Sequence, residues 1–338
     1  MRKVIVIGMG PIGVGCARAV LAESGIKLAG MVDVDTSKTG QTASDLIGKQ
    51  AKIVDQQHEP RVTTDLDEAL AKEPAVAIVA TDSQFDAIAP LLRALLERQV
   101  AVVSSCEQLA WPWYRHEALA DEIDALAQQA GRPVLGTGVN PGFVMDTLAV
   151  MLSSMVRRVT KVRCVRRLNA AVRREPLQAK IGATLSVEAF HAAVREGRVG
   201  HAGLAESAAM LATALGEQVE PESVAETIEP VIAEAPTQSL LGLIGPGEAT
   251  GLHQVARWSD ADGRPRIELD LTMAVGLDDP KDKILLDGPV QVAMKINGGL
   301  PGDSATVAAL LNQTRQIDRL QPGLRTMLDT SPAGCRFK

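Results

Sequence analysis

Three glycines and one acidic residue near the start of the sequence have the types and the spacing needed to bind a dinucleotide. Residues 8–13 read Gly-Met-Gly-Pro-Ile-Gly, and Asp33 follows Gly13 by 20 residues. Gly8 would make a tight turn, Gly10 would let the backbone approach a pyrophosphate, and Gly13 would let a helix pack closely on a strand. The helix N-terminus would offer N–H groups to the phosphates. The predicted cofactor-binding residues are therefore Gly8, Met9, Gly10, Pro11, Ile12, Gly13 and Asp33.

The acidic residue also indicates which dinucleotide is bound. Asp33 would accept hydrogen bonds from the ribose hydroxyls of the adenosine, and its charge repels the 2′-phosphate of NADP, so NAD is favoured. NADP-binding proteins often place an arginine beside the acid, and here that neighbour is Val34. Ser37 and Lys38 lie just beyond and could still hold a phosphate. We expect NAD as the cofactor and keep NADP as the alternative.

Glu107 is the candidate catalytic residue. It lies four residues beyond an apolar run at 100–103, at the end of a segment that reads Ser-Ser-Cys-Glu. Its neighbours are mostly apolar: Cys106, Leu109, Ala110, Trp111 and Trp113. Apolar surroundings favour the neutral form of a carboxyl group, so Glu107 could act as a general acid and base. The alternative is an ordinary acidic residue near the start of a helix at Pro112.

Four further polar residues could contact the cofactor or a substrate. Asn140 precedes Pro141, which keeps it out of helical geometry, and its amide could orient a nicotinamide or a substrate group. A role in a turn is the alternative for Asn140. Thr81 directly follows an apolar run and is a candidate for contact with the cofactor. Arg167 and His253 could line a substrate pocket, although a surface role remains open for each.

The elements that would position these residues alternate through the first half of the chain. Apolar runs typical of buried strands cover 3–7, 27–33, 76–80, 100–103 and 133–136, and helical stretches cover 11–23, 65–72, 84–97 and 112–130. This alternation predicts an α/β fold with a doubly wound parallel sheet of the Rossmann type. Ligands of such sheets lie outside the carboxyl ends of the strands, which is where Glu107 and Asn140 are expected.

The pattern changes after Pro141. Helices are predicted near 144–155, 186–196 and 203–215, and extended segments near 160–168, 224–234, 252–259, 266–275 and 289–296. These elements indicate an α+β domain with an open mixed or antiparallel sheet. A last helix at 303–317, with Asp303 or Ser304 as its N-cap, should return to the first domain. We expect a dinucleotide-binding domain at 1–140, rejoined by 303–338, and a substrate and dimerisation domain at 141–302.

The composition excludes several classes of protein. The 338 residues carry a net charge of −6, which argues against nucleic acid as a partner. We expect no membrane contact, because no apolar run is long enough to span a bilayer, and no metal, because no His, Asp and Glu cluster has ligand spacing. The four cysteines are scattered without a C-x-x-C pair, which fits the cytoplasm. A second-domain sheet that buries its outer face in a two-fold partner would make the protein a homodimer.

Five segments of the sequence are similar to one enzyme family. They read SSCEQLAWPW from 104 to 113, GVNPGF from 138 to 143, GHAGL from 200 to 204, GGLPGDSAT from 298 to 306 and PGLRTM from 322 to 327. In these segments the chain resembles the 2,4-diaminopentanoate dehydrogenase family, which includes native amine dehydrogenases. The resemblance covers nearly the whole chain.

The resemblance implies a fold similar to dihydrodipicolinate reductase and NAD(P)-dependent oxidative deamination, or reductive amination in reverse. It implies that Glu107 is the catalytic acid and base and Asn140 an active-site residue, with Arg167 and His253 in the substrate pocket. The substrate would be an amine or a diamino acid like 2,4-diaminopentanoate, or in reverse a ketone together with ammonia, and the resemblance leaves the choice between amine and diamino acid open. The reductase itself is a poor match, because none of the histidines is adjacent to another. Two alternatives stay open: a reductase of the same fold acting on a non-amine substrate, and a non-catalytic NAD-binding module.

Overall fold

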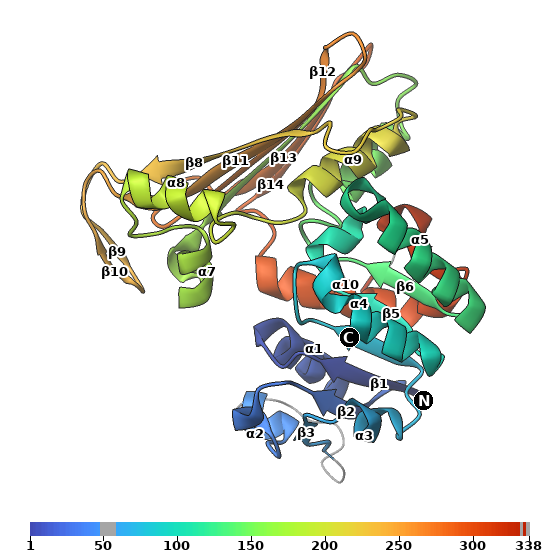
Figure 1. Cartoon of the computed structure of the whole chain (residues 1–338). Helices are drawn as coiled ribbons and strands as arrows, with labels where there is room; N and C mark the ends of the chain where they lie inside the picture. Colours follow the sequence, from blue (N-terminus) through green and yellow to red (C-terminus); the bar gives the residue numbers. More distant parts are fainter. Residues whose placement is uncertain (48–58, 332–333, 336–338) are drawn as a thin grey trace. The chain divides into compact units, whose positions relative to one another are not determined.

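The computed structural model describes residues 1–47, 59–331 and 334–335 and separates the chain into two compact units (Figure 1). The first unit contains Met1–Phe143 and Pro301–Lys338, and the second contains Val144–Leu300. The chain therefore leaves the first unit after residue 143 and returns to it at residue 301.

A seven-stranded parallel sheet forms the centre of the first unit. Its strand order is β15-β6-β5-β4-β1-β2-β3, and every neighbouring pair is parallel. In chain order the elements are β1 (Arg2–Ile7), α1 (Pro11–Leu21), β2 (Ile26–Val32), η1 (Thr36–Lys38), α2 (Ala43–Ile47), β3 (Val62–Thr63), α3 (Leu66–Leu70), β4 (Val76–Val79), α4 (Phe85–Glu97), β5 (Ala101–Ser104), η2 (Glu107–Ala110), α5 (Trp113–Ala130), β6 (Pro133–Gly136), α10 (Gly302–Gln316), η4 (Ile317–Arg319), β15 (Gly323–Arg325) and η5 (Met327–Asp329). The parallel sheet confirms the predicted Rossmann-type fold.

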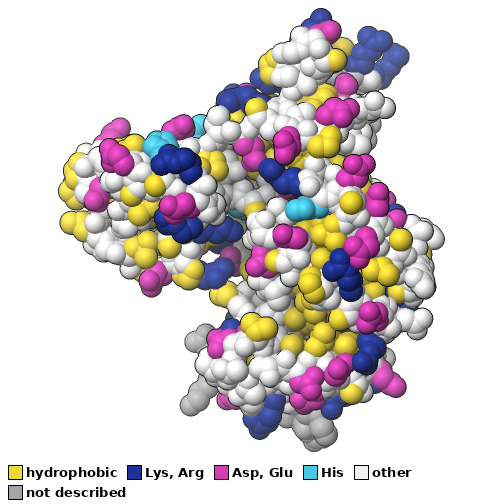
Figure 2. Space-filling model, viewed as in Figure 1, with side chains coloured by type: hydrophobic (Ala, Val, Ile, Leu, Met, Phe, Trp, Pro, Cys, Tyr) yellow, Lys and Arg dark blue, Asp and Glu magenta, His cyan; other side chains and the backbone are white. Residues whose placement is uncertain are grey.

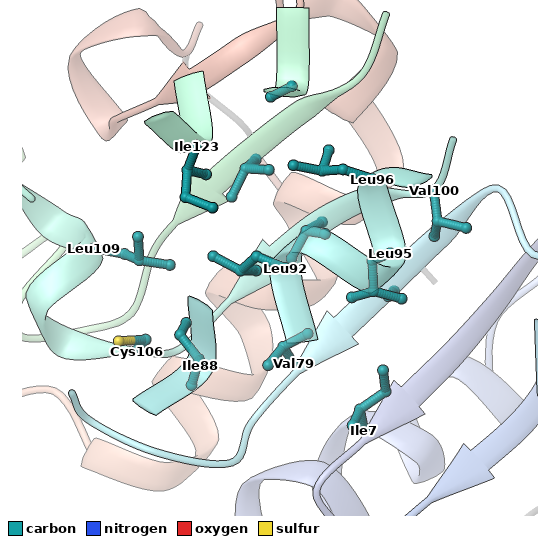
Figure 3. Close-up of a cluster of buried hydrophobic side chains, with 14 of the residues drawn as sticks. Ile7, Val79, Ile88, Leu92, Leu95, Leu96, Val100, Cys106, Leu109 and Ile123 are labelled. Carbon is teal, nitrogen blue, oxygen red and sulfur yellow. The ribbon is translucent and has the colours of Figure 1, made fainter. Parts of the chain in front are cut away.

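Alternating side chains on the central strands supply both faces of this sheet. Ile7 of β1 lies in a buried cluster with Leu92 of α4 and Ile123 of α5 (Figure 3). Its neighbour Val6 belongs to the cluster on the opposite face, which contains side chains of α1 and α10. Because helices cover both faces, these strands are apolar throughout, and this is why they are recognisable in the sequence.

The second unit is built on a six-stranded mixed sheet. Its order is β14-β13-β7-β12-β11-β8, in which β7 and β12 are parallel and the other neighbours are antiparallel. The elements are α6 (Thr147–Ser153), β7 (Lys161–Asn169), η3 (Ala170–Val172), α7 (Glu175–Lys180), α8 (Val187–Arg195), α9 (Leu204–Ala214), β8 (Ala225–Ile232), β9 (Thr237–Ser239), β10 (Gly242–Ile244), β11 (Ala249–Ser259), β12 (Pro265–Ala274), β13 (Lys281–Asp287) and β14 (Val292–Asn297). This sheet confirms the predicted α+β character of the second half.

The two faces of the mixed sheet differ in character. α9 packs against β11 and β12 on the face where Leu269 and Leu271 are buried. On the opposite face, Arg163 lies 3.0 Å from Glu268 and 3.4 Å from Asp270. We call this opposite face, which carries Lys161, Arg163, His253, Arg257, Glu268 and Asp270, the charged face. Acidic and basic side chains are also interspersed over the surface in view in Figure 2.

The sequence analysis does not predict several short elements of the structure: η1, α2, β3, α7, the β9–β10 hairpin, β13 and β15. β13 illustrates the reason. The side chain of Asp282 points to the covered face and lies 2.6 Å from Arg166 of β7, where both are almost fully buried. An ion pair thus occupies positions at which the alternating pattern of a half-buried strand requires apolar residues.

The predicted N-cap of the last helix is wrong. α10 begins at Gly302, and its N-cap is Pro301, which supplies no side-chain hydrogen bond. Pro301 has φ −69°, the value to which the proline ring restricts it, so the helix starts before Asp303 and Ser304. Asp303 instead lies in the first turn, where a carboxylate is favoured by the helix dipole.

Candidate active site

The glycine-rich loop between β1 and α1 has two glycines required by packing and one that is not. Gly8 has φ +88°, and a Cβ there would lie 2.4 Å from the carbonyl oxygen of Ala80. A Cβ at Gly13 would lie 1.7 Å from the carbonyl oxygen of Gly8. A Cβ at Gly10 would meet no atom of the described residues within 4 Å. The open space at Gly10 fits the close approach of a pyrophosphate.

The start of α1 adds hydrogen-bond donors to this loop. α1 begins at Pro11, and its N-cap Gly10 has no side chain to cap the helix. Its first N–H groups therefore remain for an anion such as a phosphate. Met9 is buried and Ile12 packs against the core, so these two residues hold the loop in place.

Asp33 follows β2, and its carboxylate is held by three donors. Oδ2 accepts from the Met9 N–H at 2.5 Å and from Lys38 Nζ at 3.0 Å. Oδ1 accepts from the Asp35 N–H at 2.8 Å. Burial alone would raise the pKa of Asp33, but these three hydrogen bonds outweigh it and lower the pKa below its ordinary value. Asp33 is therefore an ionised acceptor beside the glycine loop at neutral pH.

Three other predicted cofactor residues lie around this carboxylate or the loop. Lys38 Nζ is 3.0 Å from Asp33 and 3.6 Å from Asp35, so it bridges two carboxylates. Ser37 faces Asp35, whose Oδ1 accepts from both its N–H and its hydroxyl. Thr81 lies beside the first glycine of the loop, where its Cγ2 would be 2.9 Å from an added Cβ.

Glu107 begins η2, a single turn that follows β5. The side chains of Cys106 and Leu109 lie in the same buried cluster as Ile88 and Ile123 (Figure 3). Within 106–110, Glu107 is the one residue that is partly exposed. Among the described residues its carboxylate makes no hydrogen bond or ion pair. The backbone of the turn therefore fixes where this side chain leaves the chain, and no described side chain holds the carboxylate.

Asn140 and Glu107 follow neighbouring parallel strands, because β5 pairs with β6. Asn140 is 9% exposed, and its peptide bond to Pro141 is cis. A Cβ at Gly136, the last residue of β6, would lie 2.5 Å from the carbonyl oxygen of Leu109. Glycine at that position lets η2 rest on the end of β6. Glu107 and Asn140 thus lie at the same edge of the sheet as the glycine loop.

Thr137 belongs to this edge and is missing from the sequence-based candidates. It directly follows β6 and is 4% exposed. Its Oγ1 has no hydrogen-bond partner among the described residues. A buried hydroxyl is normally satisfied by protein, water or ligand. The sequence could have indicated Thr137, because it is a polar residue directly after an apolar strand. Thr81 is a candidate for the same reason.

Arg167 and His253 lie in the second unit, on the charged face. The pairing of β11, β12 and β7 aligns His253, Thr272 and Arg167 in one row. His253 Nε2 lies 3.0 Å from Asp270 Oδ1, and an Arg167 guanidinium nitrogen lies 3.5 Å from the carbonyl oxygen of Asp278. Both side chains therefore have partners within the second unit, and their role in substrate binding stays a prediction.

Other kinds of chemistry find little support in the described residues. In that part of the chain, no group of three or more His, Cys, Asp or Glu side chains could hold a metal ion. Burial raises the pKa of Cys16 and of Cys106 to about 12, so neither is a thiolate nucleophile at neutral pH. None of the described helices combines the length and the apolar character needed to cross a bilayer.

A family model of the 2,4-diaminopentanoate dehydrogenase C-terminal domain matches residues 143–335. The chain belongs to the 2,4-diaminopentanoate dehydrogenase family. This confirms the resemblance carried by the five sequence segments. The 2,4-diaminopentanoate dehydrogenase of Acetoanaerobium sticklandii is 28% identical over 337 residues, which cover 97% of this chain and 92% of that protein. By its name, that relative is an oxidoreductase acting on a CH–NH₂ group.

Solved structures of other proteins have the same fold as this chain. The amine dehydrogenase from Mycobacterium smegmatis has a TM-score of 0.85 at 22% identity, covering 99% of this chain and 97% of that one. GenD2 from gentamicin A biosynthesis, solved in complex with NAD, has a TM-score of 0.55 at 19% identity, covering 97% and 89%. The fold is thus one that dehydrogenases use.

Proposed function

We propose that this member of the 2,4-diaminopentanoate dehydrogenase family catalyses NAD(P)-dependent oxidative deamination of an amine or of a diamino acid like 2,4-diaminopentanoate. The reverse reaction is reductive amination of a ketone with ammonia. The observation that carries the proposal is Glu107, a partly exposed carboxylate on a tightly packed turn at the carboxyl edge of the sheet. A nicotinamide bound to a Rossmann-type sheet lies at this edge. The name of the relative in Acetoanaerobium sticklandii supports the substrate class.

In this mechanism Glu107 moves each proton. When bound, the nicotinamide supplies an acceptor for the hydride that leaves the amine-bearing carbon. Glu107 takes a proton from the substrate ammonium, which frees the nitrogen lone pair and allows an iminium to form. After releasing that proton, Glu107 takes another from the water that attacks the iminium carbon. It returns this proton to the nitrogen and then takes the hydroxyl proton as the C–N bond breaks, so that the carbinolamine gives a ketone and ammonia; the proton passes to the departing ammonia as ammonium.

The remaining site residues are proposed to bind and orient. Asn140 orients the nicotinamide amide or a substrate group from the edge that carries Glu107. The proposal depends less on Arg167 and His253, because each already has a partner in the protein. Arg167 contacts the carbonyl oxygen of Asp278, and His253 contacts the carboxylate of Asp270. The apolar side chains packed around η2 limit bulk water near Glu107, which strengthens the electrostatic interactions of its carboxylate.

NAD is the proposed cofactor, with NADP as the alternative. The fixed charge of Asp33 suits the ribose hydroxyls of NAD and repels a 2′-phosphate. NADP would require Lys38 to turn from Asp33 toward the phosphate. We also propose a cytoplasmic homodimer: its cysteines are free thiols, and the charged face offers a surface for a two-fold partner.

The proposal is tested by following NADH absorbance with purified protein, NAD⁺, 2,4-diaminopentanoate and a panel of short amines. Amine-dependent NADH formation with release of ammonia is the expected result. Hydride transfer to or from an alcohol or a C=C bond without ammonia would instead indicate another oxidoreductase on this fold. Binding of NADH without turnover of any amine, or of any ketone with ammonia, would contradict the proposal and leave a nucleotide-binding module.

A further inference from the structure

A buried amide lies directly beside the candidate catalytic residue. Gln108 is 8% exposed, and its side chain makes three hydrogen-bond contacts, with α4, with the α4 N-cap Gln84 and with α5. Its Oε1 lies 2.8 Å from the Phe85 N–H of α4 and 3.1 Å from Nε2 of His116 in α5. Its Nε2 donates to Gln84 Oε1 at 2.9 Å. The residue after Glu107 thus ties η2 to the start of α4 and to α5.

The orientation of this amide follows from its partners. A backbone N–H can only donate, so the Gln108 atom facing Phe85 must be the oxygen. That oxygen can only accept, so His116 must carry a proton on Nε2 to bond with it. Both the neutral Nε2–H tautomer and the imidazolium meet this requirement. The His116 contact is therefore kept whichever of these two forms is present.

Further contacts fix the same turn to the loop after β4. The backbone N–H of Gln108 donates to the carbonyl oxygen of Ser83 at 3.2 Å, and Cys106 Sγ lies 3.2 Å from that oxygen. The rings of His116 and Phe85 meet edge to face with centroids 5.9 Å apart. η2 is thus held from both sides of Glu107 by polar contacts as well as by the apolar cluster.

We propose that Gln108 and His116 are positioning residues, which hold the backbone turn that aims the Glu107 carboxylate. The proposal rests on the proposed function, in which Glu107 transfers protons. Because Glu107 makes no hydrogen bond or ion pair within the described residues, its aim depends on that turn. Small displacements of a catalytic group from its reactive position reduce turnover strongly. In this proposal Gln108 acts through Glu107.

The first test is a double-mutant cycle of Gln108→Leu and Glu107→Gln, measured as kcat of amine-dependent NADH formation. Gln108→Leu alone should lower kcat by about 10- to 100-fold, with the KM for NAD⁺ unchanged. In the Glu107→Gln background the same change should have little further effect, because its effect passes through the carboxylate. Gln128→Leu, an exposed glutamine of α5, is the matched control and should keep wild-type kcat.

The outcomes separate the two proposals. Near-wild-type kcat in Glu107→Gln would overturn the role of Glu107 and the positioning role with it. Two results would overturn the positioning role alone, provided that Glu107→Gln lowers kcat. One is a wild-type kcat in Gln108→Leu. The other is an equal loss of kcat from Gln108→Leu in the wild-type and Glu107→Gln backgrounds.

His116 gives a second test if Gln108→Leu does not fold. His116→Ala should lower kcat, and His116→Gln should restore most of it, because the glutamine amide N–H can replace Nε2–H. Equal loss in both variants would mean that the ring only packs. Hydrogen–deuterium exchange supplies a readout without turnover: His116→Ala should speed exchange of the amides in 106–110, whereas Gln128→Leu should not. Unchanged exchange there in His116→Ala would contradict the proposal.

Discussion

At the scale of single residues, Glu107 is the group on which the proposed chemistry depends. Glu107→Gln keeps the shape of the side chain and removes its ability to exchange a proton. We expect kcat to fall by about 10²- to 10⁴-fold, or about 3–5 kcal/mol of transition-state stabilisation. Turnover by NADH absorbance and NADH binding by fluorescence are the measurements, and binding should be unchanged.

The matched control for this substitution is Glu117→Gln, which changes an exposed glutamate of α5. It should leave kcat at the wild-type value. Wild-type turnover in Glu107→Gln would remove Glu107 from the mechanism, and equal losses in both variants would point to a general effect of lost charge.

Lys38 provides a prediction about the choice of cofactor. It pairs with Asp33 and Asp35 and is the cation that we propose would contact a 2′-phosphate. Lys38→Met should raise the KM for NADP⁺ by about 10- to 100-fold, the effect of losing one charge-assisted hydrogen bond. The KM for NAD⁺ should change much less. Equal changes with both nucleotides would show that Lys38 acts only by holding Asp33.

The lowered pKa of Asp33 determines the pH range in which its carboxylate is ionised and pairs with Lys38. A carboxylate whose pKa is lower in the folded state stabilises the fold above its ordinary pKa and loses that effect as the pH falls through the lowered value. Asp33 therefore stays ionised from neutral pH down to the acid range. Because Asp33 does not titrate near neutral pH, its charge should give the same preference for NAD over NADP on either side of pH 7.

At the scale of elements, the sequence predicts best what is apolar and long. The central strands are recognisable because helices cover both of their faces, and α1, α4 and α5 because each is long and buries one apolar face. β13 is hidden by the buried pair of Arg166 and Asp282, and β15 is a strand of three residues at the sheet edge. Glu107 and Asn140 could be chosen from their place after strands. The partners of Gln108 could not, because they come from α4 and α5.

The Arg166–Asp282 pair carries a prediction about stability. Arg166 also donates to the carbonyl oxygen of Leu300, whose N–H donates to Asp282, so the pair holds the last residue of the second unit. Arg166→Met leaves a buried charge without its partner and should lower the free energy of unfolding by about 3–5 kcal/mol. Chemical denaturation measures this change.

Two further variants sharpen that measurement. Adding Asp282→Leu to Arg166→Met should recover part of the loss, because no unpaired charge remains. Arg163→Met, which removes a half-exposed ion pair on the charged face, should change stability by about 1 kcal/mol or less. A double variant as destabilised as the sum of its singles would show that the two residues stabilise the unit independently.

At the scale of the whole molecule, the charged face is the proposed dimer interface. Leu285 of β13 pairs with Arg163 and so lies on this face. Leu285→Asp should convert the dimer to monomers in sedimentation velocity, because it places a desolvated charge in the interface. Leu243→Asp changes an exposed leucine of β10 and should leave the dimer intact. If Leu243→Asp dissociates the dimer and Leu285→Asp does not, the interface lies at the β9–β10 hairpin and not at the charged face.

The return of the chain to the first unit at residue 301 determines the order in which a ribosome completes the molecule. β6 lacks its neighbour β15, and the sheet lacks the buried Leu310 of α10, until the segment that follows the second unit has been translated. The nascent first unit therefore presents an uncovered apolar surface during synthesis of the entire second unit. Such surfaces are prone to aggregation, and a chaperone bound at this stage of translation would cover them.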